Sequence, residues 1–245
     1  LIDEAIDRGI TYFDGARGYA GREGYSGKEW KQRPDLRAKV FQASKSARRT
    51  RAGAMSDLDL TLRTMGLDHL DLWQIHDVRT RADLDEISGP GGALEAFVEA
   101  RESGKAKNIG VTGHHDPRVL EEAVRDWPVD SVMMPVNPVE AVLGGFLDRT
   151  LPAARRKGLA VIAMKVLGGG HHLFPGSGIT PRNLIRFALS QDISVAIVGC
   201  SSPAHVETLA ETGRSFTPMN EEEKQAMAEL FATAARRLAF YRGVL

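Results

Sequence analysis

Residues 146–166, FLDRTLPAARRKGLAVIAMKV, decide the fold class, because they place an amphipathic helical pattern directly before an apolar strand. The helical pattern covers residues 146–157 and stops at Gly158, a residue type that often ends helices. The run 160–166 that follows is almost continuously apolar. Such a run is typical of a parallel strand buried on both faces. The segment therefore predicts one helix–strand repeat of an α/β protein.

The same alternation extends in both directions from this segment. Strands are predicted at residues 10–14, 40–45, 70–76, 108–113, 131–137, 160–166 and 195–200. The amphipathic helical segments between them include residues 92–103, 117–126, 146–157 and 181–190. Gly9, Gly66, Gly104 and Gly158 each follow a helical stretch and precede a strand. This regular alternation predicts a parallel sheet covered by helices.

Seven predicted strands are one fewer than a closed (β/α)8 TIM barrel contains, although 245 residues suit that fold. The alternative is a doubly wound sheet, which favours a GxGxxG turn after its first strand. Gly15-Ala-Arg-Gly18 matches that motif poorly. We therefore expect residues 1–245 to form a single TIM-barrel domain that lacks the first strand. Because Leu1 already lies inside a helical pattern, we also expect an N-terminally incomplete part of a longer protein.

The composition limits the location and the partners of the protein. Thirty-two basic residues balance 32 acidic ones, so no excess of positive charge favours nucleic acid or an anionic membrane. The apolar runs are far shorter than the ~20 residues of a membrane-spanning helix. Cys200 is the single cysteine, so an internal disulfide and a cysteine metal cage are excluded. We expect a cytoplasmic protein with a small-molecule partner, and the sequence leaves its oligomeric state open.

Four ionisable side chains lie at the ends of the first three predicted strands. Asp14, Lys45 and His76 end these strands, and Tyr19 follows Asp14 by five residues in a glycine-rich loop. Any one of them alone could be a surface residue or part of a strand-end ion pair. Catalytic residues of TIM barrels lie at the C-terminal ends of strands. Their joint placement therefore favours an active site at the mouth of the barrel.

These residue types suit the reduction of a carbonyl group. Tyrosine is a poor proton donor near neutral pH, because its free pKa is about 10. We expect the Lys45 ammonium to lower the pKa of Tyr19 and so make the phenol a usable general acid. Asp14 would keep Lys45 protonated. His76 would donate a hydrogen bond to the substrate oxygen, on which negative charge develops as hydride arrives.

Several motifs along the chain resemble those of a known enzyme family. They are Gly9-Ile-Thr-Tyr-Phe-Asp14 with Tyr19, Ala43-Ser-Lys45, Asp71-Leu-Trp-Gln-Ile-His76, Gly110-Val-Thr-Gly113, Pro135-Val-Asn-Pro138, Val161-Ile-Ala-Met-Lys165 and Ile197-Val-Gly-Cys200. In order and spacing they resemble the aldo-keto reductases, and residues 164–170, MKVLGGG, are similar to a bacterial branch of that family. The resemblance implies an oxidoreductase that reduces small aldehydes or ketones with NAD(P)H. It also implies a catalytic tetrad of Tyr19, Asp14, Lys45 and His76.

The resemblance further implies a cofactor site, in which several positions differ from better-known members. Thr112 stands where a serine often holds the nicotinamide carboxamide, Met133 replaces a glutamine, and Met164 replaces a ring-stacking tyrosine. The implied cofactor-binding residues are Thr112, Met133, Met164, Lys165, Gly168, Gly199, Cys200, Ser201 and His205. NADP is the expected cofactor. NAD is the alternative, because His205 and Arg214 are the only cations near the loop expected to meet the 2′-phosphate.

Two other functions fit parts of the sequence. A regulatory or degenerate protein that binds nicotinamide nucleotides without turnover would agree with the altered carboxamide contacts. A metal-dependent hydrolase would use His76 with the pairs His114-His115 and His171-His172. Metal sites in barrels generally need carboxylates as well, and adjacent histidines tend to point in different directions. We therefore expect no metal site and keep the nicotinamide-binding protein as the alternative to a reductase.

Overall fold

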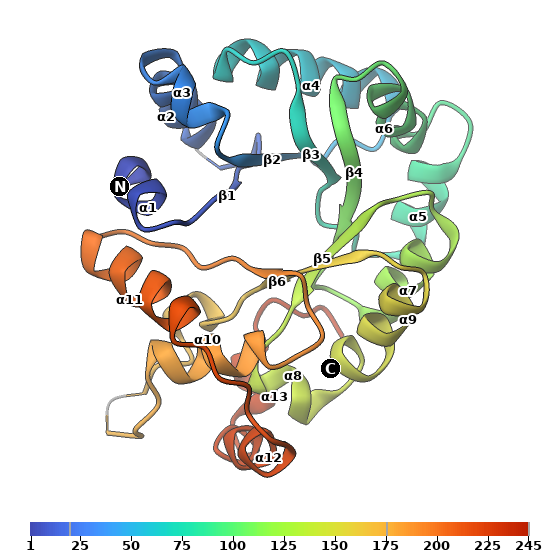
Figure 1. Cartoon of the computed structure of the whole chain (residues 1–245). Helices are drawn as coiled ribbons and strands as arrows, with labels where there is room; N and C mark the ends of the chain where they lie inside the picture. Colours follow the sequence, from blue (N-terminus) through green and yellow to red (C-terminus); the bar gives the residue numbers. More distant parts are fainter. Residues whose placement is uncertain (20, 175, 245) are drawn as a thin grey trace.

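The structure is a computed structural model that describes residues 1–19, 21–174 and 176–244, and its centre is one parallel sheet (Figure 1). All strands pair in parallel with their neighbours in the sequence, in the order β1 to β7. The sheet curls, and helices surround its outer face (Figure 1). This arrangement confirms the predicted (β/α)8 barrel class, here with seven strands. The strands are β1 (Tyr12–Asp14), β2 (Phe41–Ser46), β3 (Leu70–Ile75), β4 (Ala106–Thr112), β5 (Ser131–Pro135), β6 (Ala160–Met164) and β7 (Val195–Ala196).

Capped helices follow most of the strands and set the loops at the barrel mouth. Thr50, Asp116 and Ser202 begin α4, α7 and α11, where each side chain accepts a hydrogen bond from a backbone N–H in the first turn. No helix among the described residues is long and apolar enough to cross a membrane. The helices are α1 (Ile2–Asp7), α2 (Arg22–Gln32), α3 (Pro34–Arg37), α4 (Arg51–Met65), α5 (Arg81–Ser88), α6 (Ala93–Glu102), α7 (Pro117–Asp126), α8 (Pro138–Leu143), α9 (Leu151–Arg156), α10 (Pro181–Leu189), α11 (Pro203–Arg214), α12 (Glu221–Glu229) and α13 (Ala235–Leu238).

Several predicted elements differ from the structure by about two residues at one end, and two differ more. The strand predicted at 195–200 ends at Ala196, and the chain then turns toward the Ser202 cap. The helix predicted at 146–157 begins with a π-turn, Phe146–Thr150, before α9. There the Thr150 N–H bonds the Gly145 carbonyl five residues back, and the following Pro152 offers no N–H.

Apolar side chains fill both faces of the sheet, which explains why the strands read as continuous apolar runs. On the outer face the stacked rings of Trp73 and Phe97 belong to the large core between the strands and the helices. On the inner face a smaller cluster fills the barrel interior, with Ala43, Leu72, Met133 and Ile162 at its centre. Burial on both faces is the rule for parallel sheets of this class.

The two edge strands, β1 and β7, do not pair with each other. The helices beside them, α1 and α11, lie in contact, and Arg214 Nη2 donates to the Arg8 carbonyl at 2.6 Å (Figure 1). A cavity of about 340 Å³ opens at the starts of the strands, lined by residues that include Tyr12, Phe41 and Val195. This end of the barrel is opposite the strand ends that carry the candidate site.

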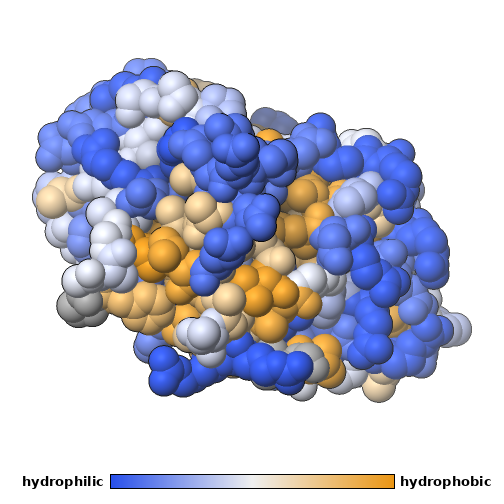
Figure 2. Space-filling model, turned by 90° about the horizontal axis from the view of Figure 1, so that it is seen from below, coloured by the Kyte–Doolittle hydropathy of each residue, from blue (hydrophilic) through white to orange (hydrophobic). Residues whose placement is uncertain are grey.

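The side of the molecule that carries α12 shows a hydrophobic area within a mostly hydrophilic surface (Figure 2). Leu230 at the end of α12 and Phe240 after α13 are exposed apolar side chains.

Candidate active site

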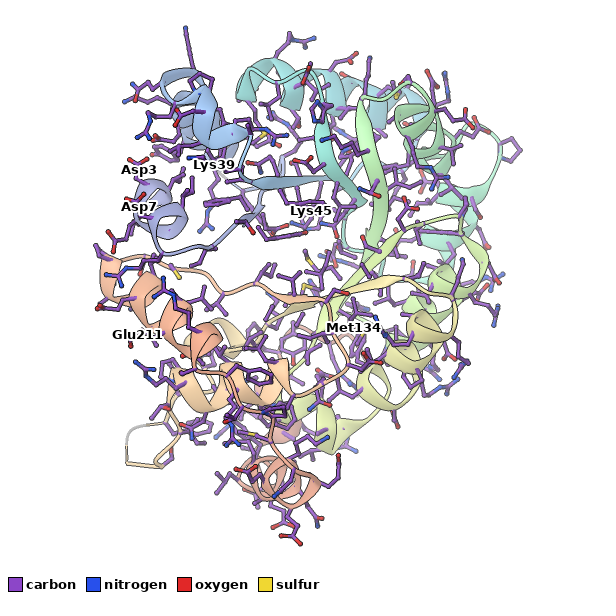
Figure 3. The ribbon with its side chains drawn as sticks, viewed as in Figure 1. Asp3, Asp7, Lys39, Lys45, Met134 and Glu211 are labelled. Atoms are coloured by element: carbon purple, nitrogen blue, oxygen red, sulfur yellow. The ribbon has the colours of Figure 1, made fainter. Side chains whose placement is uncertain are left out.

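An ion pair joins the ends of the first two strands. Lys45 Nζ lies 2.5 Å from Asp14 Oδ2 and donates a second hydrogen bond to the Gly15 carbonyl at 2.8 Å. The Lys45 side chain is only 1% exposed, and it points from β2 into the space enclosed by the sheet (Figure 3). The parallel pairing of β1 with β2 sets this geometry, because it places Asp14 beside Ala43, two residues before Lys45.

Tyr19 lies beside this ion pair, in the loop between β1 and α2. Its ring is 5.2 Å from Lys45 Nζ and 5.8 Å from the Arg22 guanidinium, measured to the ring centroid. The His76 ring stands almost perpendicular to it, at 86° and with the centroids 5.7 Å apart. Because Tyr19 is 36% exposed, a small molecule at the barrel mouth can reach it. All four residues that were predicted at the mouth are therefore close together.

The predicted direction of the Tyr19 pKa is wrong. Burial raises the pKa of Tyr19 above its ordinary value, and the carboxylates of Asp14 and Asp77 act in the same direction. The Asp14 carboxylate pairs with Lys45 at 2.5 Å and opposes the effect of the ammonium on the phenol, so burial decides the direction of the Tyr19 pKa. The phenol therefore keeps its proton at neutral pH, which is the state a proton donor needs.

Burial also opposes the charges of the ion pair itself. It lowers the pKa of Lys45, while the carboxylates of Asp14 and Glu23 act to raise it. It raises the pKa of Asp14, while Lys45 acts to lower it. Each partner thus supports the charged form of the other against the loss of water.

His76 is neutral at physiological pH. Burial, followed by the nearby Lys45 charge, lowers its pKa to about 4. A neutral imidazole carries one N–H, so it can donate a single hydrogen bond to a ligand in the mouth. Its backbone is fixed on both sides, since its N–H donates to the Ser46 carbonyl at 2.8 Å and its carbonyl accepts from Arg49 at 2.9 Å.

The residue after His76 holds an unusual backbone conformation. Asp77 has a φ of 58°, which costs energy in a residue with a side chain. Its N–H donates to Thr112 Oγ1 at 2.8 Å, and its carboxylate lies 3.3 Å from His114 Nε2. His114 Nδ1 in turn lies 2.9 Å from the carbonyl of Tyr241, in the segment after α13. These contacts hold the strained turn in place.

The residues expected at the cofactor lie on three neighbouring strands or just after them. Thr112 ends β4 and is buried, and its hydroxyl proton remains available because the oxygen accepts from Asp77. Met133 lies on β5 inside the barrel cluster, and the half-buried Met164 ends β6. Lys165 follows with a φ of 55°, and Gly168 lies in the short turn after it.

The other expected cofactor residues are Gly199, Cys200 and Ser201 in the loop after β7, and His205 in the first turn of α11. Ser201 Oγ lies 3.2 Å from His205 Nδ1, and Gly199 faces open space. Burial raises the pKa of the Cys200 thiol, which lowers the fraction present as the nucleophilic thiolate. Arg214 ends the twelve-residue helix α11, which places it roughly 16 Å from the helix start at 1.5 Å per residue. It is therefore no part of this loop.

Four further residues near the mouth are not among the site residues that the sequence predicts. Glu140 on α8 is fully buried and accepts hydrogen bonds from Tyr241 Oη at 2.7 Å and from Arg242. Asn137 donates to Tyr241 Oη at 3.0 Å and to the Lys165 carbonyl at 3.0 Å. This network ties the end of the chain to β6. Its partners lie about a hundred residues apart in the sequence, so no local pattern identifies them.

The histidine pairs do not gather into a metal site. In the described part of the chain, no group of three or more His, Cys, Asp or Glu side chains could hold a metal ion. His171 packs against Phe240, and the buried His172 packs against Phe231, with ring centroids 5.0 and 5.5 Å apart.

The sequence matches a family model described as the aldo/keto reductase family over residues 1–174. A 6-dehydroglucose reductase of Agrobacterium fabrum is 31% identical over 221 residues, which cover 80% of this chain and 70% of that protein. An uncharacterized oxidoreductase of Bacillus subtilis is 32% identical over 198 residues, or 69% of this chain and 57% of that protein. The chain spans a little over half the length of several such relatives.

Solved structures share the fold. The holo form of an aldo-keto reductase from Bacillus halodurans superposes with a TM-score of 0.77 at 21% identity, covering 94% of this chain and 85% of that one. An aldo-keto reductase from Klebsiella pneumoniae in complex with NADPH superposes with a TM-score of 0.75 at 22% identity. The match covers 94% of this chain and 83% of that one.

Proposed function

Because this chain belongs to the aldo/keto reductase family, we propose that it reduces small aldehydes or ketones to alcohols with hydride from NADPH. The observation that carries this proposal is the group of Tyr19, Asp14, Lys45 and His76 at one barrel mouth. A proton donor, a buried cation and a neutral hydrogen-bond donor are what carbonyl reduction requires on the oxygen side of the substrate.

Tyr19 supplies the proton in this proposal. Its phenol is protonated at neutral pH, because burial and the nearby carboxylates raise its pKa. As hydride reaches the carbonyl carbon, the carbonyl oxygen gains negative charge and takes the phenolic proton. The phenolate that remains lies beside the Lys45 ammonium, whose Nζ is 5.2 Å from the ring centroid. The cation therefore stabilises the phenolate after the transfer, and solvent restores the proton.

Lys45 and His76 stabilise developing negative charge in different ways, Lys45 as a cation and His76 as a neutral hydrogen-bond donor. Asp14 keeps Lys45 in place and in its charged form. His76 has a pKa of about 4, so it donates from a neutral ring and adds no positive charge next to Lys45. Fixed donors of this kind lose little energy to reorganisation as the oxyanion forms.

The chain offers suitable groups for a nicotinamide dinucleotide. Thr112 has a free hydroxyl proton for the carboxamide, and the Met164 thioether lies at the mouth to pack on a ring. Lys165 and Gly168 follow in the next loop. Gly199, Cys200, Ser201 and His205 lie at the N-terminus of α11, and the positive end of the helix dipole there favours a phosphate. When bound, the reduced nicotinamide supplies the hydride.

NADPH is the proposed cofactor because structural neighbours are aldo-keto reductases in complex with NADPH or NADP. The proposed substrate class is small carbonyl compounds, in agreement with relatives named as a 6-dehydroglucose reductase and an L-glyceraldehyde 3-phosphate reductase.

Steady-state oxidation of NADPH with a broad panel of aldehydes and ketones tests the proposal. We expect turnover with at least one class of substrate, and binding of NADPH in a fluorescence titration. Tight binding of NADPH without turnover of any carbonyl would instead favour the alternative, a nicotinamide-binding protein that has lost catalysis.

A further inference from the structure

Glu23 is a buried carboxylate outside the four residues at the mouth. It lies in the first turn of α2, four residues after Tyr19, and is 3% exposed. Its Oε1 accepts hydrogen bonds from Ser44 Oγ at 2.6 Å and Thr61 Oγ1 at 2.9 Å. Its Oε2 accepts from Arg17 Nη1 at 2.5 Å. One side chain thus joins α2, β2, α4 and the loop before Tyr19.

The contacts of Glu23 converge on the segments that carry Lys45 and Tyr19. Ser44 immediately precedes Lys45 on β2. The N–H of Arg17 donates to the Lys45 carbonyl at 3.2 Å, so the loop runs along β2 at this point. The Tyr19 N–H then closes a turn on the Ala16 carbonyl at 3.0 Å. The Glu23 carboxylate fixes the Arg17 end of this turn.

We propose that Glu23 is a positioning residue, which fixes the loop of Tyr19 against β2 and supplies a second negative charge near the Lys45 ammonium. The role of Glu23 in catalysis rests on the proposed function. The effect of the Glu23 charge on the Lys45 pKa does not rest on it, because that charge acts on Lys45 whether or not the protein is a reductase. Burial lowers the pKa of Lys45, and Glu23 acts with Asp14 to raise it.

The groups around Lys45 make the sign of the effect clear. Asp14 on β1 is in direct contact, Tyr19 lies in the following loop, and His76 follows β3. Glu23 and its partner Arg17 lie on the α2 side. Removing the Glu23 charge should lower the pKa of Lys45 further, and removing the Arg17 charge should raise it.

The test is a titration of Lys45 in the full chain without cofactor. The ¹³Cε resonance of Lys45, assigned by its loss in Lys45→Met, reports the protonation of the amine. We expect the midpoint to fall in Glu23→Gln and to rise in Arg17→Met, relative to the unmodified chain. Asp57→Asn is the matched control, because Asp57 accepts from Ser46 Oγ at 2.7 Å, on the other side of Lys45 in the sequence.

The outcomes separate this inference from the proposed function. Midpoints that are equal in Glu23→Gln and Asp57→Asn would overturn the inference, as would a loss of melting temperature in Glu23→Gln without any change of midpoint. If Glu23→Gln does not fold, an unchanged midpoint of the Lys45 titration in Arg17→Met is enough to overturn the inference. In an active protein, the basic limb of kcat against pH should move to lower pH in Glu23→Gln but not in Asp57→Asn. Absence of turnover in the unmodified chain would refute the reductase proposal and leave the Lys45 titration as the test of Glu23.

Discussion

Lys45 Nζ and Asp14 Oδ2 are 2.5 Å apart, across two neighbouring strand ends and away from water. If one partner of this ion pair is removed, water has little access to the charge that remains. Its energetic contribution should therefore differ from that of the ion pairs on the helices.

We predict that Asp14→Asn lowers the free energy of unfolding by about 3 kcal/mol, because it leaves a buried ammonium without its partner. Asp59→Asn is the control. Asp59 pairs with Lys105 at 2.8 Å in a partly exposed position, where a pair contributes about 1 kcal/mol or less. Urea unfolding at pH 7 measures both variants. Equal losses would contradict a special role for burial at the Lys45 site.

The Glu140–Arg242 pair should anchor the end of the chain. Both side chains are almost fully buried, and Tyr241 bonds the same carboxylate at 2.7 Å. We expect Arg242→Met to lower the free energy of unfolding by about 3 kcal/mol or more and to speed hydrogen exchange in residues 239–244. Arg155→Met, which breaks the exposed pair with Asp192, should change neither quantity appreciably. Unaltered exchange in Arg242→Met would show that other contacts hold the segment.

The buried His172 should make stability depend on pH. Burial lowers its pKa to about 4, whereas an unfolded histidine titrates near 6.5. The unfolded chain therefore binds the extra proton first, so this contribution is complete above pH 6.5 and is lost as the pH falls toward 4. We predict a loss on the order of 3 kcal/mol over this range. In denaturant titrations, the free energy of unfolding should depend less steeply on pH in His172→Phe than in the unmodified chain. His205→Phe is the control and should show the same slope as the unmodified chain, because His205 is exposed.

Cofactor preference should be modest. The loop 199–205 contains His205 but no arginine or lysine, and Arg214 lies at the far end of α11. Few fixed charges are therefore available for the 2′-phosphate. We expect kcat/KM for NADPH to exceed that for NADH by less than about 100-fold, equivalent to about 2.7 kcal/mol. A thousandfold preference would mean that a cation from another segment binds the phosphate.

The sequence was sufficient for the parts of the site that follow from strand order. In a parallel barrel all strands end on one face, so the positions of Asp14, Lys45 and His76 follow once three strands are located. The aldo-keto reductase resemblance is also confirmed. The strands predicted at 131–137, 160–166 and 195–200 were too long, because an apolar run does not reveal where the hydrogen bonds to the neighbouring strand end.

Tertiary contacts determine what the sequence could not predict. The direction of the Tyr19 pKa was predicted wrongly, because burial and the pairing of Lys45 with Asp14 are invisible in the sequence. Glu23 looks like an ordinary acidic residue in a first helical turn until Ser44 and Thr61 are placed beside it. Glu140 meets Tyr241 across 101 positions of sequence. These features depend on packing between elements, for which no local pattern exists.

Replacement of Tyr19 by phenylalanine tests the central claim most directly. The change removes only the hydroxyl group, so the ring still packs beside Lys45 and His76. We predict that Tyr19→Phe binds NADPH with nearly unchanged affinity in a fluorescence titration. Carbonyl turnover, followed as NADPH oxidation, should fall by about 10²–10⁴-fold. Turnover equal to that of the unmodified chain would contradict Tyr19 as the proton donor and with it the proposed mechanism.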